Sequence, residues 1–177
     1  MVSVRSSRST TERRVTRVNE KLSAACYFKS MSNLSTRSVG GIFVLVGNST
    51  TPSQAEWDTY MAQLKLAIEA REGKPLGLVV FTAGGTPDSG MRLQLRQTIG
   101  TSVVRTAIVT ESMVVRSVVG IISIFINHTR PFAPLDWRSA LEHVGFDFAN
   151  LPVLKAALQE MDANVGGSAP VRPFLAQ

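Results

Sequence analysis

The sequence predicts an α/β protein whose mixed, mostly parallel sheet follows the order β-β-α-β-α-β-α-β-α, with one further helix at the C-terminus. Two observations predict it. Short apolar runs rich in β-branched residues alternate with longer segments whose apolar residues recur every three or four positions. Strands that alternate with helices become parallel neighbours through right-handed crossovers, and the opening pair of strands, with no helix between them, makes the sheet mixed.

The two opening strands are predicted at 24–31 (AACYFKSM) and 41–47 (GIFVLVG), which are short runs of apolar, aromatic and β-branched residues. Residues 32–40 lie between them and are rich in Ser, Asn, Thr and Gly. We therefore expect this segment to be a loop that joins two antiparallel neighbours.

The first helix is predicted to begin directly after Thr51 and to end at Gly73. Thr51 is expected to be the N-cap, with Pro52 at the first helical position and Gln54 in the place of the capping-box Glu or Gln. Its apolar residues are spaced to form one buried stripe: Trp57, Tyr60, Met61, Leu64 and Ile68.

A buried strand is predicted at 76–82 (LGLVVFT), because the run is almost continuously apolar. A turn and a second helix follow, with Thr86 as the expected N-cap, Pro87 at the first helical position and Asp88 as an acid in the first turn. The buried stripe of this helix is Met91, Leu95 and Ile99, and Gly100 ends it.

The remaining elements follow from the same signals. They are a strand at 103–109, a helix at 112–126, a short strand at 130–132, a helix at about 134–144, and a last helix capped by Asn150 and ended by Gly166 and Gly167. The chain is thus expected to hold one domain over 23–166, between a basic N-terminal tail at 1–22 and a flexible tail at 167–177.

The N-terminal tail concentrates the positive charge. The chain has 19 basic and 13 acidic residues, and residues 1–22 hold six of the bases and two of the acids. With few apolar residues this segment is expected to be disordered, or to reflect an upstream start codon. Two alternatives stay open, an organelle-targeting segment and nucleic-acid binding through phosphate contacts. The nucleic-acid contacts would come from Arg5, Arg8, Arg13, Arg14 and Arg17.

Composition argues against several classes of function. Cys26 is the only cysteine, so no internal disulfide and no cysteine-rich zinc site is expected. Neither His128 nor His143 has an evident acidic residue nearby in sequence that would orient it as a catalytic base, and no G-x-S-x-G motif is present. The longest apolar-rich stretch, 113–126, is shorter than the roughly 20 residues of a membrane span. We expect no catalytic residue, no metal, no cofactor and no membrane span, in a protein of the cytoplasm.

The order of elements, with a serine near the start of the second helix after a buried strand, resembles the STAS-like (SpoIIAA-like, anti-sigma factor antagonist) domains, which are related to CRAL-TRIO lipid-binding domains. The resemblance covers about 24–145, and its most specific stretch is 81–95 (FTAGGTPDSGMRLQL). In that family the serine of a D-S-S-G or D-S-x-G turn is phosphorylated. Here Asp88-Ser89-Gly90 has a single serine and follows an added AGGT turn, while bacterial relatives often carry a Gly-Pro-polar loop there.

The resemblance implies a non-enzymatic regulatory domain of bacteria that contacts a protein partner, or a second copy of itself, near the 82–89 turn. The residues at this turn are Gly85, Thr86, Asp88 and Ser89. A phosphate on Ser89 would meet the positive end of a helix. A plain capping residue in a surface turn, and weak anion binding at the glycines, stay open as alternatives.

The helix at 112–126 suggests a different function. Its wide apolar face can be explained by deep burial, by a homodimer interface, or by a pocket for a lipid or another apolar small ligand. The residues of such a pocket would be Val115, Val118, Ile122 and Phe125. A carrier or sensor of an apolar ligand is therefore the alternative function.

Overall fold

The computed structural model describes residues 32–113, 115–116, 128–167 and 169–176. The predicted tail at 1–22, the predicted strand at 24–31 and most of the predicted helix at 112–126 lie outside these ranges. Within them the chain is an α/β unit built on one five-stranded sheet, as predicted.

The sheet has its strands in chain order. They are β1 (Leu34–Val39), β2 (Ile42–Gly47), β3 (Leu76–Thr82), β4 (Val104–Val109) and β5 (Thr129–Phe132). β1 pairs antiparallel with β2, and the pairs β2–β3, β3–β4 and β4–β5 are parallel. The mixed, mostly parallel sheet is thus confirmed, and the predicted positions of β2 to β5 are correct to within a residue.

The predicted loop at 32–40 is wrong, because β1 occupies most of it. The sequence of β1, LSTRSV, is polar because the strand lies at the sheet edge and much of it faces solvent. Gly40 and Gly41 form the turn to β2, with φ of 54° and 81°. Two successive positive φ angles are what a two-residue hairpin turn requires, and glycine adopts them without strain.

Helices α2 (Gln54–Glu69) and α3 (Ser89–Ile99) begin two residues later than predicted. The N-cap of α2 is Ser53 and not Thr51, and the N-cap of α3 is Asp88 and not Thr86. In both cases the residue after the proline supplies the side-chain oxygen that accepts from a free N–H of the first turn.

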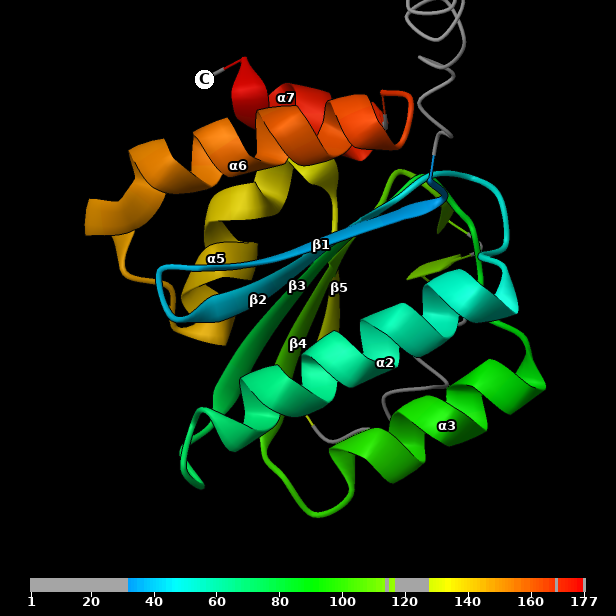
Figure 1. Ribbon diagram of the computed structural model, residues 1–177. Helices are drawn as coiled ribbons and strands as arrows, with labels where there is room; N and C mark the ends of the chain where they lie inside the picture. Colours follow the sequence, from blue (N-terminus) through cyan, green and yellow to red (C-terminus); the bar gives the residue numbers. More distant parts are fainter. Residues whose placement is uncertain (1–31, 114, 117–127, 168, 177) are drawn as a thin grey trace, which may run out of the picture. The chain divides into compact units, whose positions relative to one another are not determined.

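The helices divide between the two faces of the sheet (Figure 1). α2 and α3 cover one face, which we call the pocket face. The other face, which we call the packed face, is covered by α5 (Trp137–Val144), α6 (Leu151–Asn164) and α7 (Arg172–Leu175), with the short 3-10 turns η1 (Pro134–Asp136), η2 (Phe148–Asn150) and η3 (Ala169–Val171). The predicted helices at 134–144 and after Asn150 are thereby confirmed, but the Asn150 side chain makes no capping hydrogen bond, contrary to the prediction.

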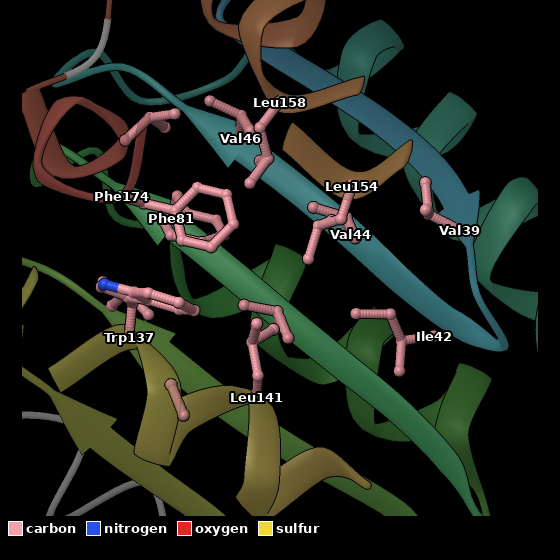
Figure 2. Packing of buried hydrophobic residues seen from close by; sticks show 14 of the residues in the cluster. Val39, Ile42, Val44, Val46, Phe81, Trp137, Leu141, Leu154, Leu158 and Phe174 are labelled. Carbon is pink, nitrogen blue, oxygen red and sulfur yellow. The ribbon is translucent and has the colours of Figure 1, made fainter. Parts of the chain in front are cut away.

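The packed face holds the larger hydrophobic core (Figure 2). Leu154 and Leu158 of α6 lie over Val44 and Val46 of β2, and all four are almost completely buried. Side chains of this kind each contribute about 1.5–3 kcal/mol when they leave water. This face therefore supplies much of the stability of the domain.

The C-terminal segment belongs to that core, so the predicted flexible tail at 167–177 is wrong for the residues that η3 and α7 contain. Phe174 is fully buried and packs edge-on against Trp137, with ring centroids 4.7 Å apart, and against Phe81 at 6.1 Å. Val171 is also fully buried. The stretch is short and is interrupted by Pro170 and Pro173, so it shows no helical period in the sequence, but Val171 and Phe174 each fill a core position.

Candidate functional site

The pocket face contains a pocket of about 620 Å³. This volume lies within the roughly 300–1,000 Å³ that is typical of small-molecule sites. Its floor is the sheet: Leu45, Leu78, Val80, Thr106, Ile108 and Thr129. These side chains share one face because the strand register places them beside one another across β2 to β5.

Aromatic and aliphatic side chains of the two helices form the walls. Trp57 and Tyr60 of α2 pack edge-to-face, with ring centroids 5.1 Å apart. Burial raises the pKa of the Tyr60 hydroxyl well above its usual range, so this residue stays neutral. Leu95 and Ile99 of α3 complete the apolar lining.

The loops after β2 and β3 form one rim of the pocket, at the carboxyl ends of these parallel strands. The two loops touch through their backbones: the N–H of Gly85 donates to the carbonyl of Asn48 at 3.1 Å. A Cβ on Gly85 would lie 2.4 Å from the carbonyl oxygen of Thr50, so only glycine fits there. Thr82 Oγ1 accepts from the N–H of Gly84 at 3.1 Å, and this hydrogen bond stabilises the turn after β3.

Glu56 joins the start of α2 to the segment before β1. Its carboxylate accepts from the backbone and side chain of Ser53, from the backbone and side chain of Asn33, and from Ser32 Oγ. Burial raises the pKa of Glu56, but the hydrogen bonds from Ser53 and Asn33 outweigh it and lower the pKa from 4.5 to about 2. The carboxylate is therefore a charged anchor for the end of α2 that borders the pocket.

One flank of helix α3 contacts α2, and the opposite flank borders the pocket. On one flank Gln94 donates to Asp58 of α2 at 2.9 Å, and this hydrogen bond lowers the pKa of Asp58 together with a second one from Gln54. On the opposite flank Arg92 and Arg96, one turn apart, line the pocket. Both arginines therefore lie on the side of α3 that borders the pocket.

Three buried polar atoms of the lining have no hydrogen-bond partner within the described part of the chain: Trp57 Nε1, Thr106 Oγ1 and Thr129 Oγ1. Thr106 and Thr129 are register partners on β4 and β5. A buried polar group without a partner costs roughly 1–3 kcal/mol. The pocket face therefore has hydrogen-bonding capacity that the described side chains do not use.

The residues predicted at the 82–89 turn divide into two groups. Gly85 and Thr86 line the pocket. Asp88 caps α3 by accepting from the N–H of Met91 at 2.8 Å, and Ser89 is the first helical residue, exposed to solvent. The turn thus presents one side to the pocket and the other to the surface.

Of the predicted apolar-ligand residues, Val115 lines the pocket and is buried. Val118, Ile122 and Phe125 lie outside the described residues. The structure therefore places Val115 at the same pocket as Gly85 and Thr86, which the sequence assigned to a different function.

The two histidines lie close to one another, His128 directly before β5 and His143 in the last turn of α5. His143 Nε2 is 2.9 Å from the carbonyl oxygen of His128, and its ring packs against Phe132. His128 has a φ of 72° at the turn into β5. No group of three potential metal ligands occurs among the described residues.

Sequence analysis missed Arg92, Arg96, Thr106 and Thr129. The arginines carry a usable signal, since they lie four apart beside the stripe of Met91, Leu95 and Ile99. The two threonines carry no such signal, because threonine has a high strand propensity and is common in β-strands without any functional role.

Comparison of the chain with protein-family models, with curated proteins and with solved structures finds no match. Among the described residues, no helix combines the length and the apolar character that a membrane span needs. The fold and the site together define an α/β domain with a pocket at the carboxyl ends of its parallel strands.

Proposed function

We propose that this domain binds an apolar small molecule in the pocket on the pocket face, as a carrier or sensor and not as an enzyme. The observation that carries the proposal is the pocket of about 620 Å³ with its mostly aliphatic and aromatic lining. In open α/β sheets, ligands commonly bind near the carboxyl ends of the strands, which is where the Gly85 loop borders this pocket.

The incomplete burial of the sheet supports this function. Val80 and Ile108 lie on the central strands β3 and β4, yet both are only half-buried, while Val79 and Ala107 on the packed face are fully buried. An apolar surface left open in the middle of a sheet lowers stability. A bound apolar molecule would cover it.

The test is a fluorescence titration of the full chain with Nile red, a neutral apolar dye. We expect saturable binding at one site. Val80→Phe places a larger side chain on the pocket floor and should weaken binding about tenfold, which is about 1.4 kcal/mol. The matched control is Val153→Phe. Val153 is 59% exposed on α6, the helix that covers the packed face, so this substitution should not change the dye affinity.

Circular dichroism and the melting temperature establish that both variants fold. Dye binding that does not saturate, or equal affinities for Val80→Phe and Val153→Phe, would contradict the proposal.

A second candidate function is contact with a protein partner through the outer side of the 82–89 turn. Thr86, Asp88 and Ser89 are exposed there, and Leu93, one turn along α3, is 57% exposed. The element order is compatible with the STAS-like resemblance, which implies such a contact. In that case Ser89 would be the regulatory position.

Ser89→Asp tests this second function. The added charge lies in the first turn of α3, where the helix dipole tolerates an acid, so folding should survive. At an interface it should lower the affinity for a partner about tenfold to a hundredfold. Partners recovered equally by the wild type, Ser89→Ala and Ser89→Asp would exclude the turn as the contact surface.

A further inference from the structure

We infer that the ligand of the pocket is a single-chain amphiphile with an anionic head, whose head group binds Arg92 and Arg96. The inference rests on the proposed function and adds the chemical class of the ligand. It depends on three observations: the positions of the charged residues in the lining, the hydrogen bond that holds Arg92, and the apolar character of the rest of the pocket.

The charge of the lining has one sign. Among the described lining residues Arg92 and Arg96 are cationic and none is acidic. The ion pairs found in the described ranges join other side chains, such as Arg37 with Glu160 and Arg138 with Glu142. The two arginines at the pocket therefore have no carboxylate of the described chain to neutralise them.

Arg92 is held at the rim. Its Nη1 donates to the carbonyl oxygen of Pro87 at 2.7 Å, in the loop that also contributes Gly85 to the pocket. A guanidinium has five N–H donors, so several remain for a ligand. Arg96 lies one turn further along the same flank of α3, so the two groups flank one edge of the pocket.

Guanidinium groups recognise planar or tetrahedral oxyanions through paired N–H···O hydrogen bonds. Carboxylate and phosphate monoester are the two heads that fit this chemistry. The remainder of the lining is mostly aliphatic and aromatic, which suits an alkyl chain. Its polar groups are uncharged: the Asn48 amide, the Trp57 indole N–H, and the hydroxyls of Tyr60 and five threonines. The occupant with both properties is an anionic amphiphile with one chain.

The head group is assigned to the arginines and not to the hydroxyls of Thr106 and Thr129. Those hydroxyls are buried, and a charge placed beside them would lose its hydration without gaining a countercharge. Arg92 and Arg96 are exposed, so the head can keep part of its water while it pairs with them. The chain then extends over Val80 and Ile108 on the pocket floor.

The experiment measures displacement of Nile red by three ligands of equal chain length: myristate, tetradecyl phosphate and tetradecanol. The two anions are used below their critical micelle concentrations and the alcohol below its solubility limit. Wild type should bind at least one of the anions about tenfold to a hundredfold more tightly than the alcohol. The stronger anion identifies the head group. The preference should fall as salt is raised, because the arginines are exposed.

The variant is Arg92→Gln with Arg96→Gln. It should lose the preference for the anion and keep its affinity for tetradecanol. The matched control is Arg105→Gln with Arg130→Gln, which removes the same charge from two exposed residues whose strand positions face away from the pocket. The control should retain the preference.

Each outcome decides something. Equal affinities of wild type for the anions and the alcohol, or a preference that survives in Arg92→Gln/Arg96→Gln, would overturn the inference while leaving the proposed function in place. A preference lost in Thr106→Val but kept in the arginine variant would place the head at the hydroxyls and also overturn it. If Nile red shows no saturable binding, the proposed function itself fails.

Discussion

The packed face and the pocket face of the sheet differ in how completely they are filled. On the packed face, Phe81, Trp137 and Phe174 interlock, and the valines of β2 lie directly under α6 (Figure 2). On the pocket face, α2 and α3 leave a pocket of about 620 Å³ above half-buried strand residues.

This difference indicates that the two faces of one sheet contribute differently to stability. Tight packing yields stability, because each buried side chain gains contacts on all sides. An open apolar face with unpartnered polar atoms lowers stability, and proteins retain such features mostly where they bind something. The packed face therefore contributes more to stability than the pocket face, whose open apolar surface is what the proposed ligand would cover.

The largest expected effect comes from one substitution made on each face. Leu158→Ala on α6 empties a fully buried position and should lower the free energy of unfolding by about 2–5 kcal/mol. Leu95→Ala on α3 has the same loss of chain and the same helix propensity, but Leu95 is half-buried beside an existing pocket, so we expect about 1–2 kcal/mol. Urea denaturation measures both, and equal losses would mean that the two faces are packed alike.

The next effect concerns the rim of the pocket. Gly85→Ala should destabilise the fold by about 1–3 kcal/mol, because its Cβ would overlap the carbonyl oxygen of Thr50 and push the two loops apart. Gly90→Ala, at an exposed position in the first turn of α3, is the control and should change stability by less than about 1 kcal/mol. The thermal midpoint reports both, and a neutral Gly85→Ala would show that the loops separate without cost.

Glu56 should make the stability of the pocket face depend on pH. Because folding lowers its pKa from 4.5 to about 2, its contribution is fully present above pH 4.5 and is lost as the pH falls through about 2. For a solvent-screened capping carboxylate we expect about 1–2 kcal/mol. Wild type should exceed Glu56→Gln in stability at pH 6, and the difference should shrink toward pH 2. A difference that is constant with pH would refute this role.

The substitution with the smallest expected effect should raise the stability of the protein instead of lowering it. Thr106→Val removes a buried hydroxyl that has no partner in the described part of the chain, and should raise the free energy of unfolding by about 1 kcal/mol. Thr82→Val is the control on the same face, since the Thr82 hydroxyl accepts from Gly84 and donates to Gly85; it should lower stability by a similar amount. Denaturation curves in which Thr106→Val is the less stable of the two would show that its hydroxyl is satisfied.

Much of the fold could be predicted from local signals. The apolar run of β3 is nearly continuous, the apolar stripe of α3 is periodic, and both segments are bounded by glycine or proline, so their positions follow from the sequence. β1 could not be found this way. An edge strand needs few apolar residues, and the signal that it does carry, the Gly40-Gly41 turn, depends on the pairing with β2.

Single residues of the candidate site could be predicted from the sequence, but not that they line one pocket. Gly85 and Thr86 were singled out from the turn and Val115 from an apolar helix, because sequence patterns describe one segment at a time. That these residues border one pocket depends on the parallel pairing of strands far apart in the chain. The roles of Glu56 and Phe174 likewise depend on partners distant in sequence, such as Asn33 and Trp137.

The contact of α6 with β1 and β2 has a consequence for synthesis on the ribosome. The strands of the sheet are added in chain order, so each new strand can pair with one that has already emerged. Leu154 and Leu158, however, cover Val44 and Val46 from the other end of the chain, and Arg37 pairs with Glu160 across 123 positions. The valines of β2 therefore stay uncovered on the packed face until α6 has been synthesised, and over that interval these apolar side chains are exposed to aggregation.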